Sequence, residues 1–248
     1  MRSDPTKRAI VRAFNAAAAT YDAASQVQRD IASELVLRAA RACEGEPRKI
    51  LDLGCGAGHV TENALRQWPR AKISALDAAP KMLAALQGKF PGVETIGADA
   101  AEPGLLGGYY DLILSSMMAH WLADPRAALQ VWRNLLAPGG KLLVALPVEG
   151  SLHEWRDACR DAGLADGLWA FPPENFAAGL TEQAEIQNFV GSYPDASAFL
   201  QSLKRTGARK PRPGHRPQSP AALRRLLASR HGAFNATFRI AFLTLEAE

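Results

Sequence analysis

The sequence predicts an α/β fold with a doubly wound, mostly parallel sheet of seven strands. The first observation is that strand-like apolar runs alternate with helical patterns between residues 49 and 147. The second is a glycine-rich turn that directly follows the first of these runs. Strands that alternate with helices pair in parallel, with helices on both faces of the sheet. The strands are expected at 49–53, 73–77, 94–97, 110–115 and 141–146, with helices between them at 59–68, 80–88 and 125–136.

The segments on either side of this alternation are predicted to add helices and two more strands. Residues 6–43 have a helical pattern with a break near 21–25, and helices are also expected near 195–206 and 219–230. The further strands are expected near 185–193 and 234–246. The chain is therefore expected to be a single domain made of N-terminal helices (1–48), a ligand-binding core (49–147), a helical cap (148–233) and a last strand (234–248).

Length and composition fit an enzyme-sized domain of the cytoplasm. The 248 residues are 48% hydrophobic, which is enough to bury a full core. The first residues lack an apolar signal core, and no run approaches the roughly 20 apolar residues of a membrane helix, so we expect a soluble, cytoplasmic protein. Cys43, Cys55 and Cys159 are far apart and form no CxxC pair, which argues against a disulfide framework or a zinc site. We expect no metal, because His, Asp and Glu do not cluster at ligand spacing.

Positive charge is concentrated late in the chain. Residues 196–245 contain ten Lys or Arg and no Asp or Glu, whereas the whole chain has a net charge of only +4. Such a segment attracts an acidic partner, which is an acidic protein, a nucleic acid or an anionic membrane, unless it is an ordinary solvated face. The ten residues are Lys204, Arg205, Arg209, Lys210, Arg212, Arg216, Arg224, Arg225, Arg230 and Arg239.

The glycine-rich turn lies in the stretch KILDLGCGAGH, which begins at Lys49. Glycines recur at every second position, at Gly54, Gly56 and Gly58, and a helical pattern starts at the next residue. Without Cβ atoms the backbone lets a ligand approach closely, and the helix N-terminus adds partial positive charge. The spacing differs from the GxGxxG fingerprint of dinucleotide-binding proteins, so it favours another cofactor.

Three aspartates at successive strand ends indicate which cofactor this is. Asp52 precedes the turn and is placed to accept hydrogen bonds from an ammonium group, directly or through water. Asp77 ends the second strand, where a carboxylate chelates two ribose hydroxyls. Asp99 follows the third strand and is expected to accept from the exocyclic amine of adenine. An ammonium, a ribose and an adenine together specify S-adenosylmethionine.

The segment from Asp52 to Gly58 resembles the D-x-G-x-G-x-G signature of class I methyltransferases, which have a Rossmann-like fold. The stretch DAAPKML, from Asp77, resembles the D-x-S-x-x-M-L that commonly follows, with Ala79 in place of serine. This resemblance covers roughly residues 49–147. It implies that the cofactor is bound by Asp52, Gly54, Cys55, Gly56, Gly58, Asp77, Ala78, Met82, Asp99, Ala100 and Ser115.

Four further stretches resemble one methyltransferase family over nearly the whole chain. The stretch after the fourth strand, SSMMAHW, lacks the N/D-P-P-Y/F element that grips a planar nitrogen, which argues against methylation of a nucleic-acid base. Together with FNAAAATYDAASQVQ, EGSLHEW and SLKRTGA, it is similar to the malonyl-acyl-carrier-protein O-methyltransferases of biotin synthesis. This resemblance implies a malonyl carboxylate as methyl acceptor and an acidic acyl carrier protein as partner. The chain departs from the family at Ser116, where asparagine is common.

Five residues are candidates for the acceptor side of the site. Tyr21 and Trp121 are the candidate catalytic residues, and Ser116, His120 and Lys204 are candidates for substrate binding. A carboxylate with a pKa near 4 is already ionised at neutral pH, so the reaction is expected to need no general base. The sequence leaves open whether the thioester is carried by a carrier protein or by coenzyme A. The alternatives are methylation of another small polycarboxylate such as trans-aconitate, and nucleic-acid binding on a methyltransferase fold.

Overall fold

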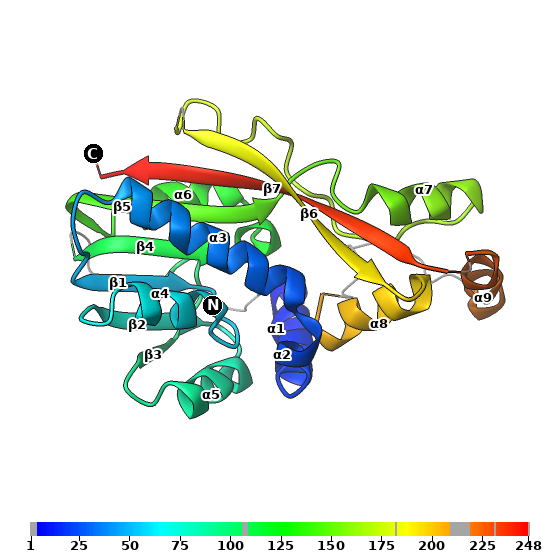
Figure 1. Cartoon of the computed structure of the whole chain (residues 1–248), viewed down its shortest axis with the longest axis horizontal. Coiled ribbons are helices and arrows are strands. Elements are labelled where there is room, and N and C mark those ends of the chain that lie inside the picture. The colour runs from blue at the N-terminus through cyan, green and yellow to red at the C-terminus, as the bar shows by residue number, and fades with distance from the viewer. Residues whose placement is uncertain (1–3, 106–108, 182, 209–218, 231, 248) are drawn as a thin grey trace.

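A twisted sheet between helical layers organises the protein (Figure 1). The computed structural model describes residues 4–105, 109–181, 183–208, 219–230 and 232–247. Within these residues seven strands form one sheet in the order β3-β2-β1-β4-β5-β7-β6. β7 is antiparallel to both of its neighbours, and the other pairs are parallel, so the predicted fold class is confirmed. The strands are β1 (Lys49–Leu53), β2 (Lys72–Asp77), β3 (Glu94–Gly97), β4 (Tyr110–Ser116), β5 (Leu136–Pro147), β6 (Ala184–Tyr193) and β7 (Phe234–Glu246).

The helices form two layers because alternate residues of the central strands point to opposite faces of the sheet. Ile50 of β1 lies in a core cluster with α3 and α4, whereas Leu51 and Leu53 lie in a second cluster with α6. In the described part of the chain, no helix is both long and apolar enough to span a bilayer. The helices are α1 (Pro5–Ala17), α2 (Tyr21–Ala24), α3 (Gln26–Ala42), α4 (His59–Gln67), α5 (Pro80–Lys89), the short 3₁₀ helix η1 (Ala119–Trp121), α6 (Pro125–Arg133), α7 (His153–Asp161), α8 (Ala196–Arg205) and α9 (Pro220–Ser229).

The start of β5 differs from the prediction. We expected the preceding helix to reach residue 136 and the strand to begin at 141, but α6 ends at Arg133 and β5 begins at Leu136. A bulge explains the difference, because the register with β4 shifts between the pairs Tyr110–Leu136 and Leu112–Lys141. Gly140 is needed in the bulge, since a Cβ there would lie 2.8 Å from the carbonyl oxygens of Ala137 and Tyr110.

The EGSLHEW stretch, residues 149–155, connects α7 to β7. Ser151 Oγ donates to the carbonyl of Arg239 (3.0 Å) and accepts from its N–H (2.9 Å). The Glu154 carboxylate accepts from the N–H of Thr237 (3.0 Å) and from its hydroxyl. Burial alone would raise the pKa of Glu154, but these two hydrogen bonds from Thr237 outweigh it and lower the pKa. The stretch therefore fixes α7 to β7.

Replacing Glu154 by Ala is expected to destabilise the protein by about 1.5–3 kcal/mol, because it removes charge-assisted hydrogen bonds to β7. The lowered pKa sets the sign of the pH dependence: the stabilisation is present above the ordinary glutamate value of 4.5 and is lost as the pH falls through the folded value. Chemical denaturation of Glu154→Ala at pH 7 and pH 4 measures both effects.

The matched control is Asp157→Ala, which removes another carboxylate of α7 whose side chain is 45% exposed and pairs only with Arg160 in the described structure. Surface pairs of this kind contribute at most about 1 kcal/mol. Equal losses in the two variants would contradict the role assigned to Glu154.

Candidate active site

A cavity of about 470 Å³ opens at the carboxyl ends of the parallel strands. Ligands of open α/β sheets bind at this edge. The turn after β1, the ends of β2 and β4 and one face of α1 line it. The lining residues are Asp4, Thr6, Lys7, Ile10, Val11, Phe14, Tyr21, Gly54, Gly56, Asp77, Ala78, Ala79, Asp99, Ala100, Ala101, Ser116, Met117, Met118, Trp121, Leu122, Ala123 and Trp169.

The glycine turn supplies a bare backbone surface to this cavity. Gly54 and Gly56 have φ values of +73° and +51°, in the left-handed region where other residues are strained. A Cβ at Gly54 would lie 2.2 Å from the side chain of Met118, so packing also excludes a side chain there. At Gly56 nothing lies within 4 Å of that position, and the residue lines the cavity. Gly56 therefore leaves open the space through which a ligand approaches the backbone.

Asp77 joins the end of β2 to the glycine turn. Its Oδ2 accepts from the N–H of Gly56 at 2.9 Å, and its Oδ1 accepts from the N–H of Ala79 at 2.7 Å. Burial raises the pKa of Asp77, although these backbone donors oppose the effect. The carboxylate lines the cavity and each of its oxygens keeps a lone pair for a ligand. This geometry suits an acceptor for the two hydroxyls of a ribose.

Asp99 lies at the cavity wall beyond β3. Its Oδ1 accepts from the N–H of Ala101 at 3.0 Å, and its Oδ2 forms an ion pair with Lys7 of α1. Ala100 and Ala101 line the cavity beside it. The structure thus brings together Asp77 and Asp99, two of the three aspartates expected to contact the cofactor.

Asp52, the third aspartate, is not among the residues that line the cavity. Its side chain is buried beneath the turn, and its Oδ2 accepts from the hydroxyl of Thr61 in α4 at 2.6 Å. Its Oδ1 has no partner within the described structure. Burial raises the pKa of Asp52 to about 7, in spite of the hydrogen bonds from Thr61. In this geometry the residue fixes α4 against β1 beneath the glycine turn.

Aromatic side chains form another part of the cavity lining. Trp121 packs edge-on against Phe14 of α1, with 5.7 Å between ring centroids, and lies 5.5 Å from Trp169. The ring of Tyr21 lines the same cavity, and burial together with the nearby charge of Asp77 raises the pKa of its hydroxyl. Tyr21 therefore keeps its proton at neutral pH and is available as a hydrogen-bond donor.

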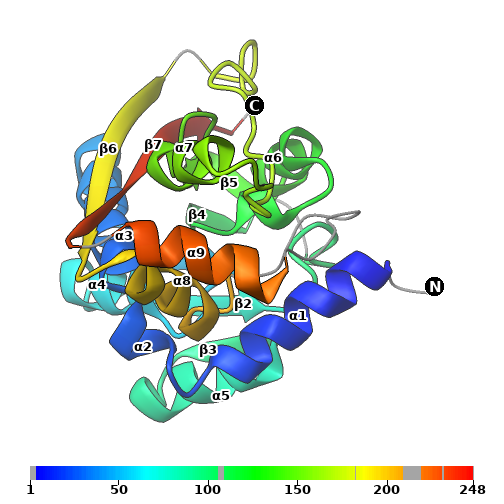
Figure 2. The same cartoon turned by 90° about the vertical axis from the view of Figure 1, so that its right-hand side faces the viewer.

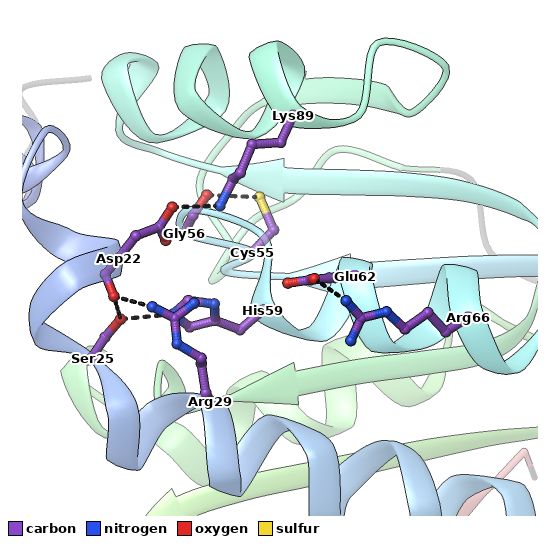
Figure 3. A network of polar contacts seen from close by, with 9 residues as sticks. All are labelled: Asp22, Ser25, Arg29, Cys55, Gly56, His59, Glu62, Arg66 and Lys89. Carbon is purple, nitrogen blue, oxygen red and sulfur yellow. Dashed lines mark hydrogen bonds and ion pairs between the residues drawn. The ribbon is translucent and has the colours of Figure 1, made fainter.

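Polar contacts hold α2, which contains Tyr21, over the glycine turn (Figure 3). Tyr21 packs on the ring of His59, with centroids 5.6 Å apart, and His59 Nε2 lies 2.8 Å from the Ser25 hydroxyl. Lys89 of α5 pairs with the Asp22 carboxylate at 2.9 Å. Burial, with a contribution from nearby Arg29, lowers the pKa of His59 to about 4. The imidazole is therefore neutral at pH 7, and its role in this network is to position Tyr21.

Several residues predicted for the cofactor site support the cavity from behind. Ser115 is buried and donates to the carbonyl of Leu53 at 2.9 Å. Met82 is fully buried under the turn, and a Cβ at Gly58 would press on Leu86 and Phe90 at 3.1–3.2 Å. Cys55 is buried beside the cavity. These residues shape the turn, and none of them is among the residues that line the 470 Å³ cavity.

The predicted substrate residues are divided between three environments. Ser116 lines the cavity. His120 is buried between Trp121 and Phe171, and burial lowers its pKa to about 3, so it is a neutral packing residue in this structure. Lys204 is exposed on α8 and is not among the residues that line the cavity.

The inner face of α1 was not predicted as part of the site. Lys7, Ile10, Val11 and Phe14 line the cavity, and their spacing is that of one helical face. The periodicity is visible in the sequence, but it does not show which part of the sheet the helix covers. Trp169 comes from the irregular segment after α7, where no periodicity places it.

The cavity fits the cofactor expected from the motif. Asp4, Asp77 and Asp99 line it, whereas Lys7, which is paired with Asp99, is the one Lys, Arg or His among its described lining residues. Gly56 leaves the backbone open to a ligand. An acidic wall of this kind favours a cationic ligand. When bound, S-adenosylmethionine would be held by Asp77, Asp99 and the turn at Gly54 and Gly56, and it would supply an activated methyl group.

Comparison with known proteins agrees with this geometry. A family model described as a methyltransferase domain matches residues 50–140. The chain is 35% identical over 89% of its length to the biotin biosynthesis bifunctional protein BioCD of Bordetella avium, of which it spans 48%. It is 32% identical to a malonyl-acyl-carrier-protein O-methyltransferase of Methylococcus capsulatus, with 85% of this chain and 81% of that protein covered. The crystal structure of the plantazolicin methyltransferase BpumL in complex with SAH matches with a TM-score of 0.57 and 16% identity, over 99% of this chain and 92% of that one.

The strand order, the glycine turn and the acid-lined cavity define a class I, S-adenosylmethionine-dependent methyltransferase. Within that class, the extended similarity to the Methylococcus capsulatus protein and others of the same name is decisive. The chain belongs to the malonyl-acyl-carrier-protein O-methyltransferase family.

Replacing Asp77 by Ala is expected to weaken S-adenosylmethionine binding at least about tenfold, because charge-assisted hydrogen bonds to the ribose contribute about 1.5–3 kcal/mol. Isothermal titration calorimetry without acceptor measures the affinity directly. Asp77→Asn retains the size of the side chain but replaces one acceptor oxygen with an NH2 donor, so it removes the charge together with one of the two backbone hydrogen bonds and should also weaken binding. Asp30→Asn, on the exposed side of α3, is the control and should leave the affinity unchanged. An unaltered affinity in Asp77→Ala would contradict the site.

Asp52 is expected to make the protein less stable as the pH rises from about 4 to about 7. Its pKa is raised from 3.8 to about 7 in the fold, so over this range the folded protein holds a proton that the unfolded chain has lost. Asp52→Asn keeps an acceptor for Thr61 and cannot ionise. Denaturation curves at pH 5 and pH 8 should show the variant gaining stability relative to the wild type at the higher pH. A pH-independent difference would mean that Asp52 is ionised throughout.

Proposed function

We propose that this protein transfers a methyl group from S-adenosylmethionine to the free carboxylate of a malonyl thioester on an acyl carrier protein, an early step of biotin synthesis in the cytoplasm. The observation that carries the proposal is the aromatic end of the cavity, where Phe14, Trp121 and Trp169 lie beside Tyr21 and the acid-lined cofactor end. The names of the relatives support the same substrate.

The proposed chemistry requires alignment and exclusion of water, and no base. The acceptor carboxylate is ionised at neutral pH, so its oxygen would take the methyl group that bound S-adenosylmethionine supplies, and the electron pair of the broken carbon–sulfur bond would stay on sulfur. No proton moves in this step. The two imidazoles near the cavity fit this scheme, because His59 and His120 are both neutral and engaged in packing.

Tyr21 is the residue we assign to the acceptor. Its hydroxyl is protonated, and its ring is held by His59 at the junction of the acidic and aromatic parts of the cavity. A donated hydrogen bond would orient the carboxylate oxygen toward the methyl carbon, and the aromatic walls would strip water from it. Ser116 lines the same cavity and its Oγ has no partner within the described structure, so it is the second candidate donor.

A comparison of acceptors tests the proposal. Methyl transfer should be fast with malonyl carrier protein, measurable with malonyl-CoA and malonyl-pantetheine, and absent with trans-aconitate. Tyr21→Phe should lower kcat about tenfold or more while changing cofactor affinity less than about twofold, because one hydrogen bond is lost on the acceptor side. The pH profile of kcat should show no inflection near 7. Transfer to trans-aconitate alone, or an inflection near 7 that His120→Gln abolishes, would overturn the assignment.

A further inference from the structure

Four helices, of which only α1 lines the cavity in the described structure, have the opposite charge to the cavity wall. The helices α1, α5, α8 and α9 contain Lys or Arg but no Asp or Glu within their bounds. Inside the cavity the ionisable groups are mainly Asp4, Asp77 and Asp99. An acidic interior and a basic exterior select two different ligands, a cationic cofactor and an anionic partner.

The sequence located this positive charge only in residues 196–245, and the structure changes that assignment. Arg209, Lys210, Arg212 and Arg216 lie outside the described residues. Arg230 pairs with Asp161 at 3.0 Å, and Arg239 pairs with Glu174. The charges of this segment that are exposed and in no ion pair of the described structure are those of Lys204, Arg205, Arg224 and Arg225.

The N-terminal helix adds two cations that the sequence analysis did not include. Arg8 and Arg12 are four residues apart on α1 and therefore share a face; both are exposed, and neither has a side-chain partner among the described residues. The adjoining face of the same helix lines the cavity through Lys7, Val11 and Phe14. Any partner that binds the outer face of α1 thus lies one helix diameter from the cavity.

α1 and α8 form one continuous surface. The hydroxyl of Thr20, just after α1, donates to the carbonyl of Arg205 at 2.8 Å. A Cβ at Gly207 would lie 3.2 Å from both the Ala13 carbonyl oxygen and the Phe14 Cα, so the two segments are in close contact. Figure 2 shows α1, α8 and α9 together on the face turned toward the viewer.

We propose that the acidic carrier protein docks on the seam of α1 and α8, with Arg8 and Arg12 on one side and Lys204 and Arg205 on the other. The inference rests on the proposed function and adds to it the surface that recognises the protein part of the substrate. Charge complementarity is the argument for this occupant. Four exposed cations, in no ion pair of the described structure, lie on α1 and α8, and the inner face of α1 lines the cavity in which the thioester must be placed. Docking here presents the malonyl group to the cavity along the inner face of α1.

The test compares a large acidic substrate with a small one. Arg8→Glu/Arg12→Glu should raise the KM for malonyl carrier protein about tenfold or more at low ionic strength, and less in about 0.5 M salt, because reversal turns two attractions into repulsions that salt screens. The KM for malonyl-pantetheine and the affinity for S-adenosylmethionine should stay within twofold of the wild type. Lys204→Glu/Arg205→Glu should have the same selective effect, and Arg8→Gln/Arg12→Gln a smaller one.

The matched control is Arg41→Glu/Arg70→Glu, which changes the net charge equally. Both residues are exposed. Arg41 lies in the last turn of α3, which leads to β1, and Arg70 lies two residues before β2, so both precede the amino ends of strands. A similar rise in the KM for malonyl carrier protein in this control would overturn the docking surface. An unchanged KM in both Arg8→Glu/Arg12→Glu and Lys204→Glu/Arg205→Glu would overturn it as well. Equal losses with malonyl-pantetheine would show that α1 acts on the cavity and not on the carrier. A wild type inactive on every malonyl thioester would overturn the proposed function itself, and the docking surface with it.

Discussion

The hydrogen bond from the N–H of Gly56 to the carboxylate of Asp77 is the contact on which the site depends. It joins the turn after β1 to the end of β2, so the two neighbouring strand ends hold one geometry. The left-handed φ of Gly54 and Gly56 allows that N–H to point at the carboxylate, and the bare backbone at Gly56 leaves the cavity open above it. Asp52 supports the same turn from below by binding Thr61 of α4. The two aspartates thus have different tasks, although both lie near the carboxyl end of a strand. Asp77 lines the cavity, whereas Asp52 supports the turn beneath it.

The fold could be predicted from sequence because its signals are local. Apolar runs of strand length, bounded by glycine, proline or aspartate, fixed the positions of the strands to within a few residues, and the turn at Gly54–Gly58 identified the strand that carries the site. The exception was β5, whose first residues precede the bulge at Pro138–Gly140 and are separated by it from the rest of the strand. There the pairing with Tyr110 of β4, a long-range contact, determines the strand, and no local pattern reveals it.

From local pattern alone, the candidate site could be predicted where the chain places residues at a strand end. Tyr21 and Trp121, which were predicted together with the family resemblance, also line the cavity. Asp77 and Asp99 follow directly from their strands, and both line the cavity. Lys7 and Trp169 could not be found in this way, since each reaches the cavity from an element whose docking is decided by tertiary packing. For His120 the sequence suggested a substrate-binding role because the residue is ionisable and close to the site. In this structure its ring is buried between Trp121 and Phe171. Residue type indicates possible chemistry, whereas burial and partners decide which chemistry remains.

The helix α1 links the two electrostatic requirements of the proposed reaction. Its inner face closes an acidic and aromatic cavity, in which a cationic cofactor is favoured and a carboxylate is stripped of water. Its outer face carries Arg8 and Arg12, in no ion pair of the described structure, which suit an acidic protein. The two faces are kept apart by the helix itself, so the cations that attract the carrier do not compete with Asp77 for the cofactor. A single amphipathic helix, held by Asn15 to α5 and by Thr20 to the end of α8, thus separates recognition of the carrier from the site of methyl transfer.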